Sequence, residues 1–240
     1  MKKPALRKET RTFVVEGEKE IHMALEAGYE PEQLFISENA RPSKNGLDKI
    51  PQTLLSSKIF ESLSYRNGKD GLLAVFRFGN HDLNGFRPGA RSLIIILEAV
   101  EKPGNLGAVM RCADGAGVDA VIVCDPKTDI YNPNVIRSGV GCLFTVPLFL
   151  AGVSEVLDFC KKNNIAVYAA SPEAKENYWD LDFKGSTALA FGTEADGLSD
   201  SWNTGAKHFN IPMRGKNDSL NVSVSTGIVI YEVLRQRREA

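Results

Sequence analysis

The hydrophobic positions of the chain follow two patterns, one before and one after about residue 80. In the first part, short segments with strand character, "TFVVEG", "EQLFISE" and "GLLAVFRF", alternate with segments of helical spacing, "GEKEIHMALEAG" and "SSKIFESLS". Gly28 marks the expected end of the first helix, and Ser56 or Ser57 is the expected cap of the second. This part therefore predicts a small α/β domain.

The second part contains continuous apolar runs instead: "SLIIILEAV", "VDAVIV", "IAVYAAS" and "TALAFG". Segments with helical spacing stand among them: "NLGAVMRCADGAG", "NPNVIRSGVG" and "VSEVLDFCKKNN", the last with Ser154 as a candidate cap. Strands that are apolar throughout are typical of a parallel sheet buried on both sides. We therefore expect an α/β fold, with a parallel sheet and helices on both of its faces.

The two patterns meet at "GNHDLNGFRPGA", residues 79–90, which is rich in Gly, Asn and Pro. This composition predicts a flexible connection and a domain boundary. We place the first domain at residues 1–88 and the second at residues 89–240.

The segment "IPMRGKNDSLNVSVSTGIVIYE" near the end of the chain is ambiguous. Its middle alternates like a strand, yet Val224, Ile228, Tyr231 and Leu234 fall on one helical face. Small polar side chains compete with the backbone for hydrogen bonds, which favours them at the start of a helix over its interior. We expect a helix from about Ser219 to Gln236, with that apolar face in the core.

Composition excludes several classes of protein. Hydrophobic residues make up 43% and charged residues 25%, as in ordinary globular proteins, and the net charge of −1 argues against a broadly basic nucleic-acid binder. Local basic residues near the start either meet phosphates or belong to a solvated, partly disordered tail. These residues are Lys2, Lys3, Arg7, Lys8 and Arg11.

Compartment and metal content follow from what the sequence lacks. The longest apolar run is too short to span a membrane, and the start of the chain has no signal-peptide core. The four cysteines form no CxxC pair, and the three histidines have no metal-ligand spacing. We expect a cytoplasmic protein with reduced thiols, no metal and no membrane contact.

Three segments combine glycines with polar residues just past a predicted strand: "EKPGNLGAVMR", "FGTEADGLSD" and "IPMRGKNDSLNVS". Ligands of parallel α/β sheets bind outside the carboxyl ends of the strands. One such loop can merely turn the chain, but three together predict a composite binding site. No GxxxxGK[ST] signature is present, and "GAGVDA" lies between a helix and a strand, which is the wrong context for a dinucleotide fingerprint.

These same three segments resemble, in order and spacing, the motifs of the SpoU/TrmH family of RNA 2′-O-ribose methyltransferases, in the SPOUT superfamily. The resemblance covers residues 92–237, and the first domain is similar in layout to the substrate-binding domain of the ribosomal-RNA members. It implies an S-adenosylmethionine cofactor and a trefoil knot in the catalytic domain. It also implies a homodimer, with the last helix around Ile228–Leu234 near the interface.

The resemblance also implies roles for particular residues. Its catalytic positions correspond to Arg111, Asn105, Glu194, Ser219 and Asn221, and its cofactor-binding positions to Gly192, Ile211, Met213 and Leu220. Because a guanidinium stays protonated in proteins, we expect Arg111 to stabilise charge and grip phosphate, although a role as base is the alternative. Asn105 and Asn221 are expected to orient the hydroxyl or Arg111, and Glu194 to pair with Arg111.

Two other functions stay open at this point. One is methylation of a transfer-RNA nucleotide, and the other is RNA binding without catalysis. The separate first domain favours structured ribosomal RNA as the substrate. The specific RNA and nucleotide are not readable from the sequence.

Overall fold

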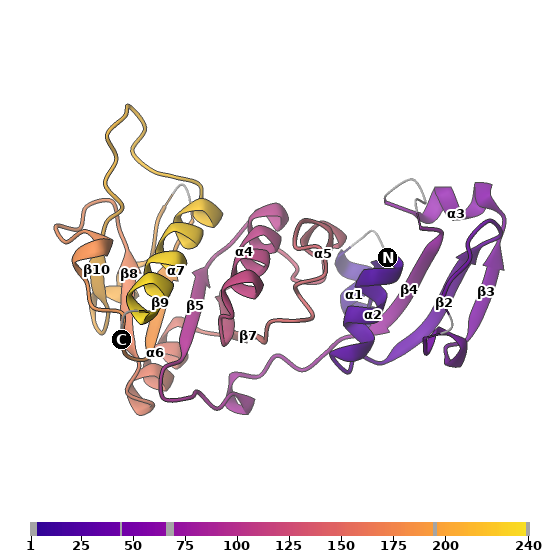
Figure 1. Cartoon of the computed structure of the whole chain (residues 1–240), viewed down its shortest axis with the longest axis horizontal. Helices are drawn as coiled ribbons and strands as arrows, with labels where there is room; N and C mark the ends of the chain where they lie inside the picture. Colours follow the sequence, from indigo (N-terminus) through magenta and orange to yellow (C-terminus); the bar gives the residue numbers. More distant parts are fainter. Residues whose placement is uncertain (1–3, 44, 66–69, 194–195, 239–240) are drawn as a thin grey trace.

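The computed structural model describes residues 4–43, 45–65, 70–193 and 196–238, and it consists of two β-sheets placed end to end (Figure 1). The first sheet has the order β1-β4-β2-β3, in which β4 runs antiparallel to both neighbours and β3 runs parallel to β2. Its elements are α1 (Pro4–Thr10), β1 (Thr12–Glu16), α2 (Glu18–Glu26), β2 (Pro31–Ser37), η1 (Leu47–Lys49), β3 (Gln52–Leu55), α3 (Ser57–Leu63) and β4 (Leu72–Arg77).

The second sheet is wholly parallel, with the order β10-β8-β9-β5-β6-β7. Its strands are β5 (Leu93–Glu98), β6 (Ala120–Cys124), β7 (Leu148–Ala151), β8 (Ala166–Ala170), β9 (Thr187–Phe191) and β10 (Lys207–Phe209). Its helices are η2 (Leu83–Gly85), α4 (Pro103–Ala116), α5 (Pro133–Ser138), α6 (Val153–Lys162), η3 (Tyr178–Asp180), η4 (Asp200–Asn203) and α7 (Val222–Arg238).

Helices cover both faces of this sheet, as the continuous apolar strands predicted. In β5, Leu93, Ile95 and Leu97 pack into the core beneath α4, α5 and α7. Ile94 and Ile96 point the other way, into a second core that α6 closes. Successive side chains of a strand point to opposite faces, so a strand buried on both must be apolar at every position.

Helices α4 and α5 pack unusually closely. A side chain at Gly107 of α4 would collide with Ser138 and with the backbone of Val135 and Gly139 in and after α5. The helix α4 ends at Gly117, which has a φ of 65° and so adopts the left-handed conformation that glycine tolerates best. These glycines place α4, which carries Asn105 and Arg111, against the rest of the molecule.

The start of the chain differs from the prediction of a basic, partly disordered tail. Residues 4–10 form α1, and the Arg7 side chain is only 1% exposed. Arg7 Nε lies 2.7 Å from Asp129 Oδ2, in the second part of the chain. Arg7 is therefore unavailable to phosphate, because its charge is neutralised inside the protein. Lys2 and Lys3 lie outside the described residues.

The last helix is present, but the predicted core face is wrong. Val224 and Tyr231 are 49% and 56% exposed, and Ile228 and Leu234 are only partly buried. The buried positions lie on another face and are Val222, Thr226, Val229, Ile230, Val233 and Gln236. Two of them are polar and are satisfied internally: Thr226 donates to the Val222 carbonyl, and Gln236 bonds to Phe183 and Leu181. Hydrophobicity alone therefore selected the wrong side of the helix.

Three smaller expectations also fail. The helix α6 begins at Val153 with Gly152 as its cap, so Ser154 lies inside the helix and does not cap it. The strands β3 and β7 were not predicted, and β3 escaped because it is short and exposed, with Leu54 71% exposed. The third expectation was a flexible connection at residues 79–90, but this segment packs against the rest of the protein. Leu83 is buried, and Phe86 packs against Phe149 and Phe159.

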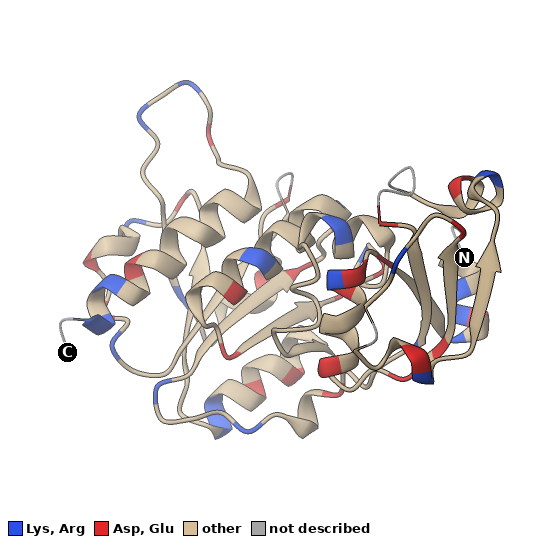
Figure 2. Cartoon of the chain, turned by 45° about the vertical axis from the view of Figure 1, so that its right-hand side comes forward, with Lys and Arg blue, Asp and Glu red and all other residues tan. Residues whose placement is uncertain are grey.

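Charge and thiol chemistry are unremarkable across the described part of the chain. Acidic and basic residues are interspersed over both sheets (Figure 2). All four cysteines are free, and burial raises the pKa of Cys124 and Cys160 to about 12, so neither is an activated thiol. Within the described ranges, no helix is long and apolar enough to cross a membrane, and no three potential metal ligands cluster together.

Candidate functional site

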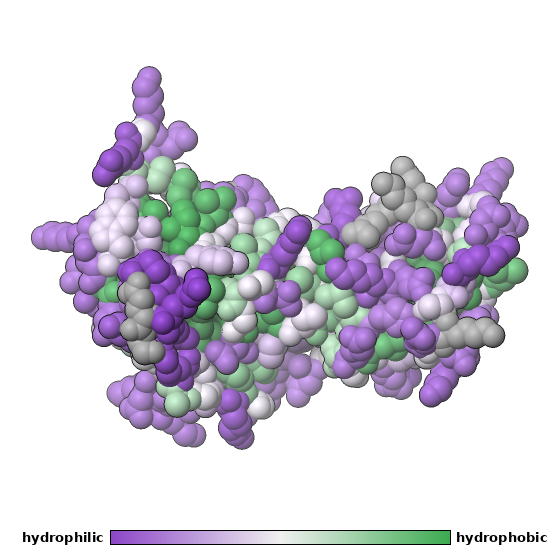
Figure 3. All heavy atoms as spheres, viewed as in Figure 1, coloured by the Kyte–Doolittle hydropathy of each residue, from purple (hydrophilic) through white to green (hydrophobic). Residues whose placement is uncertain are grey.

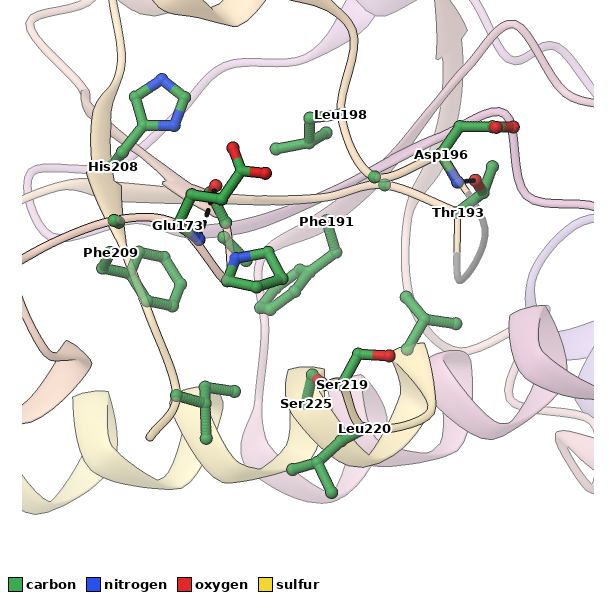
Figure 4. A pocket seen from close by; sticks show the side chains of 18 of the residues that line it. Glu173, Phe191, Thr193, Asp196, Leu198, His208, Phe209, Ser219, Leu220 and Ser225 are labelled. Atoms are coloured by element: carbon green, nitrogen blue, oxygen red, sulfur yellow. Dashed lines mark hydrogen bonds between the residues drawn. The ribbon is translucent and has the colours of Figure 1, made fainter. Parts of the chain in front are cut away.

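A cleft of about 800 Å³ opens at the carboxyl ends of β8, β9 and β10. It is lined by residues 170–174 after β8, by the described residues of 191–203 after β9, and by residues from the long loop between β10 and α7. That loop projects from the body of the protein beside the start of α7 (Figure 1). In the close-up, Glu173 and Asp196 come from the strand-end loops, while Ser219, Leu220 and Ser225 face them from the α7 side (Figure 4).

The structure brings all four of the expected cofactor positions together. Gly192, Ile211, Met213 and Leu220 all line the cleft, and Ser219 does too. Phe191, Leu198 and Phe209 add apolar surface. Pockets for small molecules are usually apolar with a few placed polar groups, and this lining has that character.

One expected segment is absent from the cleft, and one unexpected segment takes its place. The loop after β5, which contains Pro103 and Asn105, does not line it, whereas Ser171, Pro172 and Glu173 after β8 do. The sequence contained a signal for these residues, because "SPEA" follows a strand that runs parallel to its neighbours. Sheet order was needed to use that signal, since β8 lies between β10 and β9.

The loop after β9 is a tight turn that explains Gly192. The Thr193 amide donates to the Gly197 carbonyl at 3.1 Å, and the Gly197 amide donates to the Thr193 carbonyl at 3.2 Å. A side chain at Gly192 would collide with the backbone of Gly197 and Leu198. Glycine is thus required at this position for the loop to close on itself.

A buried carboxylate holds the segment that follows this loop. Glu98, at the end of β5, accepts hydrogen bonds from the Ser199 amide (2.8 Å), the Ser199 hydroxyl (2.7 Å) and the Trp202 indole nitrogen (3.0 Å). Buried charges require such partners, because an unpaired one is costly. Sequence reasoning missed Glu98, although an acidic residue that ends an otherwise apolar strand is a signal that something must pair with it.

Beside the cleft, Asn221 joins α7 to α4. Its Oδ1 accepts the Ser223 amide at 3.0 Å, which caps the first turn of α7. Its Nδ2 donates to Asn105 Oδ1 at 3.1 Å, across a sequence separation of 116 residues. The two asparagines of the predicted catalytic set therefore meet, while the helix starts at Val222 and leaves Ser219 in the loop.

The remaining predicted catalytic residues have different positions. Arg111 is exposed on α4, six residues after Asn105, and it is not part of the cleft lining. Glu194 lies outside the described residues, so the predicted pair with Arg111 stays a prediction.

The cleft is electrically one-sided. Its described lining includes Glu173, Asp196, Asp200 and Asp218 but no Lys or Arg. A carboxylate-rich cleft attracts a cationic group and repels phosphate. It suits a sulfonium compound better than a nucleotide phosphate.

Comparison with known proteins agrees with this geometry. A model of the SpoU rRNA Methylase family matches residues 92–231, and a model of the MRM3-like substrate binding domain matches residues 1–74. A 23S rRNA (guanosine-2′-O-)-methyltransferase, RlmB, from Xylella fastidiosa strain Temecula1 is 34% identical, over 85% of this chain and 83% of its own.

Solved structures give the same result. A crystal structure of an RNA 2′-O ribose methyltransferase is 39% identical, with a TM-score of 0.85, and covers 99% of this chain and 93% of that one. The SpoU methyltransferase AviRb from Streptomyces viridochromogenes, in complex with the cofactor AdoMet, is 27% identical with a TM-score of 0.90. It covers 99% of this chain and 95% of that one. With its family model spanning the whole parallel sheet and both asparagines in place, the chain belongs to the SpoU rRNA methylase family.

Proposed function

We propose that this protein transfers a methyl group from S-adenosylmethionine to a ribose 2′-hydroxyl of RNA, with 23S ribosomal RNA as the substrate. The observation that carries the proposal is the meeting of Asn221 with Asn105 beside an acidic, partly apolar cleft. Membership of the SpoU family and the activities named for its relatives support it. We propose a cytoplasmic location, which an rRNA substrate supports.

The cleft has the chemistry to hold the methyl donor. Ile211 and Leu220 offer apolar surface for the adenine, and the backbone near Gly192 and Met213 offers polar groups for its edge and for the methionine. The sulfonium is positively charged, so the carboxylates of the lining favour it. When bound, the donor supplies a methyl carbon that an oxygen nucleophile can attack.

The chain's own residues would align and activate the hydroxyl. Alignment of two reactants alone can supply much of the rate, provided that the attacking atom is held close to the carbon. Asn221 is held by its cap bond and by Asn105, so its amide has a fixed orientation from which to direct the hydroxyl. Ser219 in the preceding loop is a second polar contact.

Arg111 is assigned the charge-stabilising role. Removal of the proton leaves negative charge on the attacking oxygen, and a guanidinium near it lowers the barrier. Exposure of Arg111 on α4 leaves its fork free to reach a phosphate of the RNA as well. Glu194, outside the described residues, is proposed to orient it.

The first domain, residues 1–88, is proposed to bind the RNA, and residues 89–240 to carry out the chemistry. The match of residues 1–74 to a substrate-binding domain supports this division. Arg7 cannot contribute, but Lys8, Arg11 and Lys19 are exposed. Their contacts with phosphate are expected to weaken with added salt.

We also propose a homodimer and a trefoil knot in the catalytic domain. The exposed apolar face of α7, with Val224 and Tyr231, is a surface that a second copy would cover. Figure 3 shows apolar atoms at the surface over the first turns of α7. Sedimentation at low protein concentration tests the dimer. An experimental structure tests the knot: the backbone is knotted if it stays threaded when its two ends are joined outside the molecule.

The decisive experiment uses the full chain, S-adenosylmethionine and a 23S rRNA transcript. Calorimetry is expected to show stoichiometric donor binding, and nucleoside mass spectrometry a 2′-O-methylated nucleoside. A methylated base would move the enzyme to a different reaction class. Absence of donor binding would favour an RNA-binding protein without catalysis. Mapping 2′-O-methyl sites in cells with and without the protein then identifies the nucleotide.

A further inference from the structure

The junction between the two domains is built around a buried tyrosine. Tyr131, in the loop before α5, is 2% exposed and lies in the second part of the chain. Its ring stacks on Phe13 of β1 at 4.2 Å between ring centroids and on Phe78, just after β4, at 4.4 Å. Aromatic pairs of this kind add specific geometry to simple apolar burial.

The Tyr131 hydroxyl also makes hydrogen bonds with residues 79–90, the connection between the domains. The Gly79 amide donates to it at 2.7 Å, and His81 Nε2 lies 2.6 Å away. His81 Nδ1 faces the Leu148 carbonyl at 2.7 Å, and a carbonyl can only accept, so Nδ1 carries the hydrogen. Nε2 is therefore the acceptor, and Tyr131 donates to it. Every polar atom in this chain of contacts has a partner of the right kind.

The connection itself is added to the edge of the parallel sheet. The Leu150 amide of β7 donates to the His81 carbonyl at 2.9 Å, and Asp82 forms a parallel bridge with Leu150. Residues 79–82 are thus held from both sides. A flexible segment would let the first domain sample many positions, whereas this one is hydrogen-bonded to both Tyr131 and β7.

A second contact fixes the same loop. Asp129, two residues before Tyr131, pairs with the buried Arg7 of α1, and its other oxygen accepts the Tyr131 amide at 2.9 Å. This loop leads directly into α5, which is packed against α4 through Gly107. The first domain is therefore connected by rigid, buried contacts to the helix that carries Asn105 and Arg111.

We infer that Tyr131 is a positioning residue that determines which nucleotide is methylated, because it sets the place of the first domain relative to Asn105 and Arg111. The inference rests on the proposed function. If the first domain grips the RNA, a rigid junction presents one ribose to the donor, whereas a loose junction presents any ribose within reach. Tyr131 does not touch substrate, and it acts through the domain that it holds.

The test compares three variants of the full chain. Tyr131→Phe keeps the stacked ring and removes the hydroxyl, and Tyr131→Ala removes both. Tyr168→Phe is the matched control, since it also removes a hydrogen-bonded tyrosine hydroxyl, which donates to the Asp182 carbonyl at 2.8 Å, but lies within the parallel sheet. Each variant is assayed for donor affinity, for kcat and KM with 23S rRNA, and for the distribution of 2′-O-methyl sites.

Domain position is measured separately from activity. Spin labels are placed on exposed Lys49 and Lys161, each replaced by Cys, in a Cys112→Ser background, with unlabelled chain in excess. The parent and the Tyr168→Phe control are expected to give one narrow distance. Tyr131→Phe is expected to broaden it, and Tyr131→Ala to broaden it further.

The expected kinetic result is a higher KM for RNA with kcat nearly unchanged. KM for RNA rises about 5-fold or more in Tyr131→Phe, because the hydroxyl's hydrogen bonds with Gly79 and His81 are lost, and methylation spreads to neighbouring nucleotides. Donor affinity and kcat stay near those of the parent. Retention of a single methylated site by a variant with a broadened distance would overturn the inference, and so would an unchanged distance in both Tyr131 variants. If Tyr131→Ala does not fold, Tyr131→Phe decides alone. A parent that binds the donor but methylates no RNA refutes the proposed function. Its narrow distance distribution distinguishes that outcome from a failure of the inference about Tyr131.

Discussion

The acidic cleft and the domain junction are built by opposite rules. At the junction, Tyr131, His81 and Asp129 have their polar atoms paired within the protein, and burial raises the pKa of Tyr131 and lowers that of His81. At the cleft, acidic side chains face solvent, and His208 Nε2 is buried without a hydrogen-bond partner among the described residues. Groups left unsatisfied in this way are available to a ligand.

This difference separates two kinds of mutational effect. Substitutions at the junction remove packed contacts, so they are expected to lower the free energy of unfolding. Substitutions at the cleft and at the Asn105–Asn221 pair remove groups that face solvent or a ligand, so they are expected to change binding or rate with little loss of stability. Four predictions test this separation, beginning with the largest effect.

The largest effect is expected at Arg111. Arg111→Ala should lower methylation by about 100-fold or more, as does loss of a group that stabilises transition-state charge, while donor affinity stays nearly unchanged. Arg111→Lys should also be severely impaired, because a point charge cannot bridge a phosphate and the attacking oxygen as a fork does. Initial rates and calorimetry measure the two quantities.

A control for Arg111 lies at the other end of the catalytic part. Arg235 is an exposed arginine of α7 that pairs with Glu232 at 2.8 Å, and its replacement by Ala should leave the rate unchanged. If Arg111→Ala stays active, the catalytic assignment is wrong, and Ser219 and Asn221 become the candidates.

The next effect is expected at Gly192. Gly192→Ala places a methyl group against the Gly197 backbone, so the loop after β9 must open, and donor affinity should fall about 10-fold or more. Gly185→Ala is the matched control, since a methyl group there meets nothing within 4 Å and Gly185 does not line the cleft. Calorimetric titration distinguishes them. Equal donor affinity in the two variants would show that the closed loop is not needed for binding.

Asn221 should separate capping from catalysis. Asn221→Asp keeps the oxygen that accepts the Ser223 amide and removes the donor to Asn105, so stability should be kept and the rate should fall about 10-fold. Asn221→Ala removes both contacts and should also lose about 1 kcal/mol of unfolding free energy. Denaturant unfolding and initial rates give the two readouts. Full activity of the Asp variant would limit Asn221 to a cap.

The smallest effect is a pH dependence at the junction. Burial lowers the pKa of His81 in the folded protein, so the unfolded chain binds its proton first as the pH falls. Stability from this site is present above the unfolded pKa of about 6.5 and is lost as the pH falls from there toward the lower folded pKa. One proton contributes a slope of at most about 1.4 kcal/mol per pH unit.

The measurement is denaturant unfolding from pH 7.5 to pH 5 for the parent and for His81→Gln. The parent should lose stability more steeply toward acid, and its slope minus that of the variant reports His81. Identical slopes would show that His81 has no lowered pKa. The unfolding of His22→Gln is the control measurement, because His22 is on the first domain and is partly exposed.

The sequence predicted the parts of the molecule whose cause is local or repetitive. The strand β5 is apolar from Leu93 to Leu97 because both of its faces are buried, and a run of that kind is readable without coordinates. The helix α4 ends at Gly117 because a left-handed residue stops a helix, which is again a local signal. The motif segments around Gly192 and Ile211–Leu220 line one cleft because they immediately follow strands of a parallel sheet.

Only the tertiary structure decided which surfaces meet. The sequence identified an apolar stripe on α7, but that stripe and the face with Thr226 and Gln236 are both compatible with a helix. The hydrogen bonds of Gln236 to Leu181 and Phe183 belong to the face that is buried. Glu173 joined the cleft because β8 lies beside β9 in the sheet. Gly79 and Tyr131 are 52 residues apart, and no local pattern connects them. Such contacts depend on the mutual placement of whole elements, which the spacing of residues along the chain does not encode locally.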